Sequence, residues 1–197
     1  HVVILRYHQG HLEGLLIDDP RDVENREWTL PSVPLMRGET PHQTLSRVFG
    51  KGHARDAIQF AELGSFWPMN EGEDDWSVGL AFLGLVKPDH EVQLADQASR
   101  ALWHPLSKRP DLKWNSADIL DAGVKHLRQR INVDTYPLTL LPVKFRTKQA
   151  RQLYSQILDQ PVAPRPFKAW LRRRQAVTRK GPATFSRNDT LKHDWLL

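Results

Sequence analysis

Four cations near the C-terminus have the types and spacing needed to bind phosphate groups. Arg165, Lys168 and Arg172 stand at positions i, i+3 and i+7, and Arg173 follows directly. On a helix this spacing gathers side chains toward one face. The remaining face is apolar and consists of Phe167, Trp170 and Leu171. Such a helix can turn its apolar side toward its own domain and its cations toward the phosphates and base edges of a nucleic acid.

The basic charge of the chain is concentrated in the same region. Residues 144–197 hold 13 Lys and Arg residues against three acids, a formal charge of +10. Residues 1–143 keep the other 15 basic and 20 acidic groups, a formal charge of −5. The C-terminal region therefore attracts polyanions and the larger N-terminal region repels them. A basic segment that only forms a solvated face is the alternative interpretation.

A second candidate site lies in residues 38–55, GETPHQTLSRVFGKGHAR. Glu39 precedes a short predicted helix and Arg47 lies within it. The two side chains either form an ion pair between loop and helix or contact an anionic ligand. Trp28 before this segment, and Phe66 and Trp67 after it, are candidates for stacking on a ligand, although each can also be purely structural.

Strand and helix signals predict a mixed unit of strands and helices in residues 1–131. Apolar runs at 2–7 and 12–18 flank a turn and predict a β-hairpin, and prolines make residues 28–31 extended. Thr40 as N-cap and Pro41 as first helical residue predict a short helix that ends near Gly50. Further strands are predicted at 58–67 and 76–86, and an amphipathic helix at 117–131.

The C-terminal region predicts two helices followed by a hairpin. Thr147 can cap the first helix, residues 160–163 form a turn, and Pro164 stands at the start of the second helix. Residues 176–185 alternate around a Gly-Pro turn and predict a hairpin with Arg179 and Lys180 at its tip. Two prolines and the change in charge at 134–142 indicate a domain boundary, which divides the chain into residues 1–135 and 136–197.

The order of strand, loop and short helix around residues 31–49 resembles the Nudix fold. The signature of that family is G-x5-E-x7-R-E-U-x-E-E-x-G-U, where U is a bulky aliphatic residue. With Glu39 as the first Glu, Arg47 falls on the Arg of the family. The opening Gly of the signature is replaced by Val33.

The three remaining Glu positions of the signature carry no acid in this chain. They are occupied by Val48, Lys51 and Gly52, which share one helical face. The family uses that face to hold a divalent metal, and magnesium requires hard oxygen ligands. Lys51 adds a repulsion of about 4 kcal/mol per unit charge at ~4 Å and an effective dielectric constant of about 20. The sequence therefore predicts neither a metal site nor catalytic residues here.

Residues 140–174 resemble the C-terminal domain of the Nudix-related transcriptional regulators of NAD metabolism. In that family a segment of the form LLP-x-K-F-T…LQ…Y…ILG-x-P…FRRKL follows the Nudix domain and folds as a winged helix-turn-helix. The residues of this chain at corresponding positions are Leu140, Leu141, Pro142, Lys144, Phe145, Leu153, Tyr154, Ile157, Leu158, Pro161, Phe167, Lys168 and Leu171. The two resemblances together imply an α+β fold, a Nudix-like mixed-sheet α/β/α sandwich with a C-terminal winged helix-turn-helix.

The resemblance implies a DNA-binding transcriptional regulator with a catalytically inactive, ligand-sensing Nudix domain. Its effector would be ADP-ribose or another NAD-related nucleotide, with no other cofactor, and it would bind a palindromic DNA site as a homodimer. The predicted DNA-binding residues are Lys148, Arg165, Lys168, Arg172, Arg173, Arg179 and Lys180. The predicted ligand-binding residues are Trp28, Glu39, Arg47 and Trp67.

Two other functions remain open at this point. A Nudix hydrolase acting on a nucleoside diphosphate derivative could recruit metal through acids elsewhere, for example Glu71, Glu73, Asp74 and Asp75. A nucleotide sensor whose basic tail binds RNA or a protein is the other, although the patterning typical of single-strand platforms is missing.

Composition favours a folded protein that is not inserted in a membrane. Hydrophobic residues make up 40% of the 197 residues, and no cysteine is present for a disulfide or a thiolate metal site. The longest apolar run, residues 78–86, is about half of what a bilayer-spanning helix requires. A cytoplasmic location and no contact with membrane are therefore expected.

Overall fold

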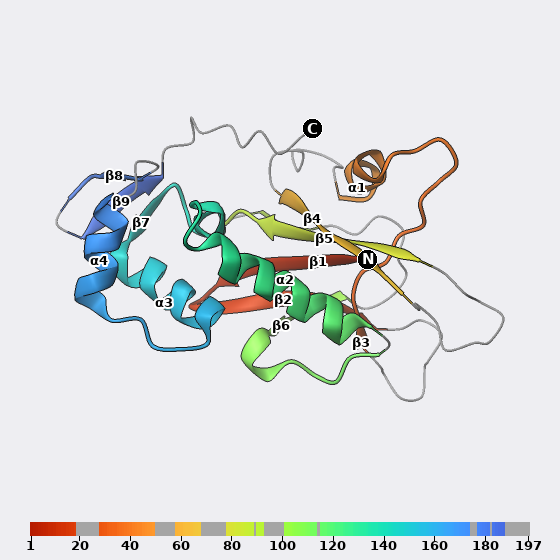
Figure 1. Cartoon of the computed structure of the whole chain (residues 1–197), viewed down its shortest axis with the longest axis horizontal. Helices are drawn as coiled ribbons and strands as arrows, with labels where there is room; N and C mark the ends of the chain where they lie inside the picture. Colours follow the sequence, from red (N-terminus) through yellow and green to blue (C-terminus); the bar gives the residue numbers. More distant parts are fainter. Residues whose placement is uncertain are drawn as a thin grey trace.

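The computed structural model describes residues 1–18, 28–49, 58–67, 78–88, 90–92, 101–113, 115–173, 177–181 and 183–187. Within these ranges the backbone of Arg179 is described but its side chain is not. The described elements extend along one axis, with helix α1 near one end and helix α4 and strands β7–β9 at the other (Figure 1).

A six-stranded mixed sheet forms the centre of the molecule. Its strands are β1 (Val2–His8), β2 (His11–Asp18), β3 (Trp28–Thr29), β4 (Ile58–Phe66), β5 (Gly79–Val86) and β6 (Ala101–Pro105). Their order is β3-β2-β1-β5-β4, and β6 pairs with β2. Strands β1 and β5 run parallel, whereas β1–β2, β2–β3, β2–β6 and β4–β5 are antiparallel.

Strands β1 and β2 form the hairpin that the sequence predicts. His8 pairs with His11, and the two residues between them, Gln9 and Gly10, have φ values of 48° and 88°. Positive φ at both central residues is typical of a type I′ turn, whose twist matches that of the strands. Gly10 suits this conformation because it has no Cβ.

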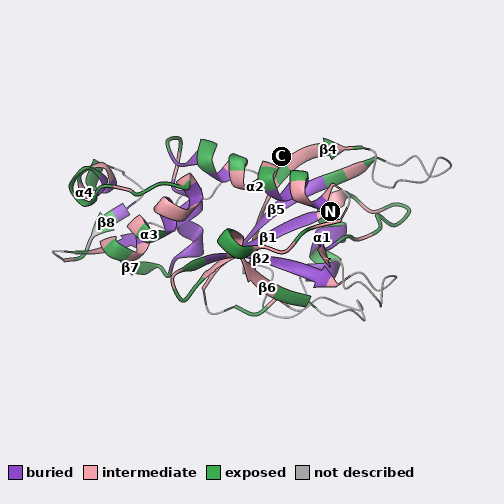
Figure 2. Ribbon diagram, turned by 90° about the horizontal axis from the view of Figure 1, so that it is seen from below, coloured by how far each residue is buried: buried purple, intermediate pink, exposed green. Residues whose placement is uncertain are grey.

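The sheet has an apolar core on each face, because alternate residues of a strand point to opposite sides. Helix α2 (Ser116–Arg130) covers one face, where Val3 and Leu83 pack with Ile119. Helix α1 (Pro41–Phe49) covers the other, where Ile4 and Phe82 belong to one buried cluster with its own apolar side chains. The central strands are accordingly buried (Figure 2). This arrangement confirms the predicted α/β/α sandwich with a mixed sheet.

The start of helix α1 also agrees with the sequence. The Thr40 hydroxyl accepts a hydrogen bond from the Gln43 backbone N–H at 3.2 Å, and the Thr40 N–H donates to Gln43 Oε1 at 2.7 Å. This reciprocal pair is a capping box, with Pro41 as the first helical residue.

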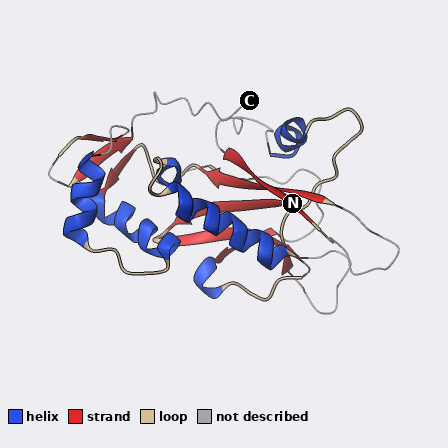
Figure 3. Cartoon of the chain, viewed as in Figure 1, coloured by secondary structure: helices blue, strands red, loops and turns tan. Residues whose placement is uncertain are grey.

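A smaller unit follows the 3-10 helix η3 (Tyr136–Leu140). Its elements are β7 (Lys144–Arg146), α3 (Thr147–Leu158), α4 (Pro164–Arg173), β8 (Val177–Arg179) and β9 (Thr184–Arg187). The strands form a separate antiparallel sheet in the order β7-β9-β8, beside the two helices (Figure 3). Two helices joined by a turn and followed by a hairpin are consistent with a winged helix-turn-helix.

The predicted capping role of Thr147 is wrong. Helix α3 begins at Thr147 itself, and the Thr147 hydroxyl donates to the carbonyl of Ala183 at 3.1 Å. The side chain that serves the helix start is that of Gln149, whose Oε1 accepts from the Arg146 N–H at 2.8 Å. Strand β7 is the reason, because it runs directly into the helix and leaves Arg146, with φ −87° and ψ 146°, as the N-cap.

The apolar core beneath helix α2 continues into the smaller unit. One cluster of buried residues includes Leu127 of α2, Leu138 of η3 and Tyr154 of α3. The predicted boundary between residues 135 and 136 coincides with the start of η3, and the division into domains stays a prediction. No helix in the described ranges combines the length and apolarity needed to cross a membrane.

Candidate nucleic-acid interface and ligand site

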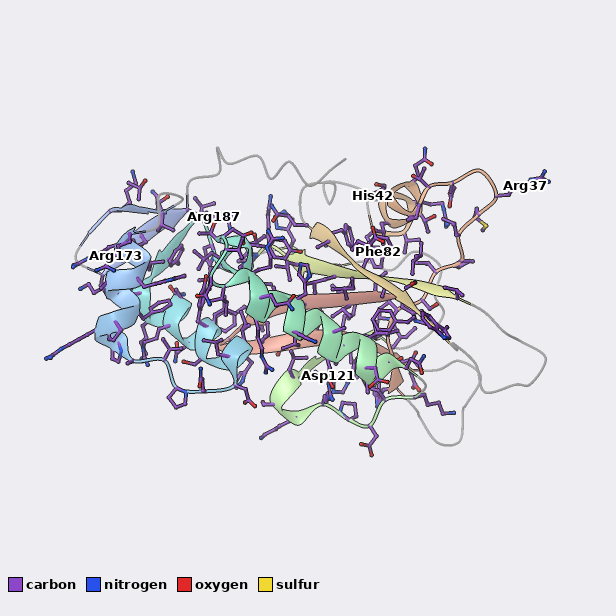
Figure 4. The ribbon with its side chains drawn as sticks, viewed as in Figure 1. Arg37, His42, Phe82, Asp121, Arg173 and Arg187 are labelled. Atoms are coloured by element: carbon purple, nitrogen blue, oxygen red, sulfur yellow. The ribbon has the colours of Figure 1, made fainter. Side chains whose placement is uncertain are left out.

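Helix α4 presents its cations away from its buried side. Arg165, Arg172 and Arg173 are exposed and Lys168 is half-buried. Phe167 lies on the opposite side with 5% of its surface exposed. Arg173 points outward at the far end of the molecule (Figure 4). The predicted division of this helix into a charged and an apolar face is confirmed.

The other predicted DNA-binding residues belong to the same small unit. Lys148 is exposed in the first turn of α3, and Lys180 is exposed directly after β8. Arg179 lies on β8, but its side chain falls outside the described part of the structure. The assignment of these cations to DNA stays a prediction.

No acid neutralises these cations in the described part of the chain. The ion pairs found there involve other residues, namely Arg6–Glu13, Arg47–Glu39, Arg109–Asp121 and Arg130–Asp134. Asp159 is the one acid in the sequence between 144 and 187, and it sits at the C-cap of α3 with φ 53°. The small unit thus keeps its positive charge available to an external anion.

An aromatic cluster fixes the orientation of α4. The ring centroid of Tyr154 lies 5.2 Å from that of Phe167 and 5.4 Å from that of Trp170. The turn before α4 is held by Arg151, which donates to the Val162 carbonyl at 3.1 Å, and by Ser155, whose hydroxyl accepts from the Val162 N–H at 3.1 Å. These contacts hold the charged face of α4 in a set direction.

Glu39 and Arg47 form the ion pair that was one of two interpretations of this segment. Arg47 Nε donates to Glu39 Oε1 at 2.7 Å, and Arg47 Nη2 donates to Glu39 Oε2 at 3.0 Å. The Thr44 hydroxyl also donates to Glu39 Oε2, at 2.8 Å. Both carboxylate oxygens are therefore engaged within the protein, as expected for a bidentate arginine–carboxylate pair. A contact between either residue and a ligand stays a prediction.

The first missing acid of the Nudix signature is replaced by a core residue. Val48 is 4% exposed and belongs to the buried cluster between α1 and the sheet. Lys51 and Gly52, at the other two positions, lie outside the described residues. In the described ranges no group of three His, Cys, Asp or Glu side chains is arranged to hold a metal ion.

The whole chain resembles known proteins of one architecture. It is 18% identical to Shewanella oneidensis NrtR, whose crystal structure superposes with a TM-score of 0.70 over 94% of this chain and 90% of that one. The chain has the NrtR fold. A MutT/nudix family protein from Enterococcus faecalis shares it, with a TM-score of 0.74, 16% identity, and coverage of 94% of this chain and 84% of that one.

A relative of the NrtR type also matches by sequence. The chain is 20% identical over 171 residues to the ADPR responsive transcriptional repressor NtrR of Acinetobacter baylyi. The aligned region covers 85% of this chain and 68% of that protein. No protein-family model matches the chain. The predicted resemblance to the Nudix-related regulators is thus confirmed by both the relative and the fold.

The two aromatic residues predicted to bind ligand lie in different parts of this NrtR fold, Trp28 on β3 and Trp67 just after β4. Trp28 lies on β3, half-buried, with its ring 4.6 Å from that of His104. Trp67 follows β4 and is 63% exposed. Burial lowers the pKa of His104, so its imidazole beside Trp28 is biased toward the neutral form. Their roles as ligand-binding residues stay predictions.

The sequence did not predict three side chains that join the small unit of the NrtR fold to the larger, sheet-containing part. They are two arginines and a glutamine. Arg187 Nη1 donates to the Leu138 carbonyl at 2.8 Å, Arg128 Nε donates to the Ile157 carbonyl at 2.5 Å, and Gln156 bonds the β1–β2 turn. Their partners are backbone atoms far away in sequence, which no local pattern specifies. Strand β7 was also missed, although the alternation in Lys-Phe-Arg was a usable signal.

The Glu39–Arg47 pair predicts a measurable carboxyl titration. Hydrogen bonds from Arg47 and then Thr44 lower the pKa of Glu39 from 4.5 to about 2. Glu39 should stay ionised and paired until pH falls through about 2, and the stability that the pair contributes should be fully present above pH 4.5. An NMR titration of the Glu39 carboxyl carbon checks this. In Arg47→Ala the midpoint should rise toward 4.5, and a midpoint unchanged by the substitution would contradict the pairing.

Proposed function

We propose that this chain is a DNA-binding transcriptional regulator whose Nudix-like domain senses ADP-ribose or a related NAD-derived nucleotide. The observation that carries the proposal is the set of cations on α4: Arg165, Arg172 and Arg173 are exposed, Lys168 is half-buried, and no acid pairs with any of them in the described part of the chain. An aromatic cluster packs against the opposite side of the helix. A helix built in this way in a helix-turn-helix is suited to the major groove of DNA.

The similar proteins support this proposal. The Acinetobacter baylyi relative is named as an ADPR responsive transcriptional repressor. Shewanella oneidensis NrtR has been crystallised with a 27mer DNA, in a structure that superposes on this chain with a TM-score of 0.71. Its Nudix domain has also been crystallised with ADP ribose.

We further propose that the chain binds its nucleotide without hydrolysing it. Glu39 is engaged by Arg47 and Thr44, and Val48 is buried where the signature requires an acid. Neither residue is free to coordinate the metal that such chemistry uses. Incubation with magnesium and ADP-ribose tests this proposal, because a turnover of about 1 s⁻¹, the low end of ordinary enzymes, would show an active hydrolase.

We also propose that the protein is cytoplasmic and binds a palindromic DNA site as a homodimer. A two-fold dimer would place its two α4 helices about 34–36 Å apart, one helical turn of DNA. Binding of ADP-ribose would change DNA affinity if it favoured one arrangement of the dimer over another.

Mobility-shift titration on the DNA upstream of the chain's own gene, with and without ADP-ribose, tests partner, specificity and effector together. We expect a specific shift that ADP-ribose changes about 5- to 150-fold, the usual range of allosteric coupling. Single-stranded DNA and RNA serve as competitors, and a preference for either over duplex DNA would overturn the assignment.

Binding to duplex DNA should weaken steeply as salt rises. Each phosphate contact releases condensed counterions, so the log-log slope should amount to several units, at about −0.9 per neutralised phosphate. Kd values measured at salt concentrations between ~50 and ~200 mM test this slope. A flat salt dependence would show that the basic unit does not grip a phosphate backbone.

A further inference from the structure

The outer edge of strand β2 changes partner where strand β6 ends. Strand β6 pairs with β2 from Ile17 down to Glu13, which is opposite Pro105, the last residue of β6. In an antiparallel ladder successive residues turn their backbone groups to alternate sides. The N–H of Leu12 does not bond to β6, although Leu12 itself is buried. A buried N–H at this position requires another acceptor.

The side chain of Gln156 supplies that acceptor from helix α3. Gln156 Oε1 accepts from the Leu12 N–H at 2.7 Å, and Gln156 Nε2 donates to the Gly10 carbonyl at 2.6 Å. One side-chain amide thus bonds the backbone of the β1–β2 turn through both its acceptor and a donor, as a neighbouring strand would.

A third hydrogen bond holds the same end of α3. Arg128 of α2 donates from Nε to the Ile157 carbonyl at 2.5 Å. The C-terminal turn of α3 is therefore attached to both the sheet and the helix that covers it. The opposite end of α3 carries Lys148, and α4 packs on α3 through Tyr154 and Phe167. A shift of the β1–β2 turn would be carried along α3 to the charged face of α4.

We propose that Gln156 is the positioning residue that couples the Nudix-like sheet to the helix-turn-helix. The inference rests on the proposed function, because the signal it transmits is the effect of ADP-ribose on DNA affinity. Apolar contacts between α3 and the sheet also exist, but they are non-directional. The two amide bonds have defined directions, so they fix the register of α3 against the turn.

Gln156→Ala should separate ligand response from ligand binding. We expect its DNA affinity without nucleotide to stay within about twofold of the parent, because the DNA-facing residues lie elsewhere. The Kd ratio with and without ADP-ribose should fall from the parent's value, about 5- to 150-fold, toward 1. ADP-ribose affinity, measured by calorimetry, should be retained. Gln156→Glu keeps the acceptor but loses the donor to Gly10, and it tests the same bond in a side chain of equal size.

Gln152→Ala is the matched control, because Gln152 is exposed on the same helix. The ratio of its DNA Kd values with and without ADP-ribose should equal that of the parent. If the parent responds to ADP-ribose and Gln156→Ala responds equally, the coupling role is overturned and the proposed function stands. If the parent itself does not respond, the proposed function is overturned and the coupling with it. Amide exchange at Leu12 should be faster in Gln156→Ala than in Gln152→Ala, and equal rates would also overturn the proposal.

Discussion

Replacing Arg172 and Arg173 together by Ala should weaken binding to operator DNA on the order of 100-fold or more. Both side chains are exposed at the C-terminal end of α4, and no acid pairs with either in the described part of the chain. A cation that reads a base contributes about 1–3 kcal/mol, and one that contacts a phosphate contributes about one unit to the salt slope. Titrations at two salt concentrations measure both effects.

Two further variants make this test specific. Arg37→Ala removes an exposed cation from the loop before α1, at the opposite end of the molecule from Arg173 (Figure 4), and should leave DNA binding unchanged. Lys in place of Arg172 and Arg173 keeps the charge but loses the planar, bidentate donor group. Base reading predicts a loss of sequence preference in the Lys variant, whereas phosphate contact predicts little change. Full operator affinity in the double Ala variant would refute the assignment of α4.

The parts of the fold that the sequence predicted are those with strong local signals. The β1–β2 hairpin follows from two apolar runs around a turn, and helix α1 follows from Thr40 and Pro41 at its start. The charged face and the opposite apolar face of α4 follow from the helical spacing of its residues. In each case the signal lies within a few residues of the structure it specifies, so tertiary contacts only had to agree with it.

The parts that were missed depend on contacts between distant segments. Strand β6 is placed by its pairing with β2, about 90 residues earlier in the chain. The error at Thr147 has the same cause, because β7 is placed by its pairing with the distant strand β9 and runs into α3, which makes Arg146 the N-cap in place of Thr147. Gln156 is an ordinary polar residue on an amphipathic helix until the β1–β2 turn is brought beside it.

The candidate sites show the same division. The pairing of Glu39 with Arg47 was one of two possibilities from the sequence, and their geometry depends on a turn that places the loop against α1. The cations of α4 were identified by spacing alone, because a charged helical face needs no distant partner. Trp28 was chosen for its type, and its actual neighbour, His104, comes from strand β6.

Phe167→Ala should have the largest effect on stability. Phe167 is 5% exposed, and its ring contacts both Tyr154 and Trp170, with centroids 5.2 and 5.5 Å away. Truncation of a buried Phe to Ala typically costs about 3–5 kcal/mol, through lost burial and the cavity left behind. For a protein of this size the midpoint of thermal unfolding should fall by roughly 6–20 °C. Calorimetry and denaturant unfolding measure the change.

The same substitution probes how far the small unit depends on the larger one. Phe167 belongs to the buried cluster that also contains Leu127 and Tyr154. Its truncation should therefore lower the stability of both units in one cooperative transition rather than unfold α4 alone. Leu35→Ala is the control, since Leu35 is 54% exposed and its truncation should change stability by less than about 0.5 kcal/mol. A Phe167→Ala protein that lost DNA binding with an unchanged thermal midpoint would show that the ring contacts DNA directly instead of orienting α4 from within the core.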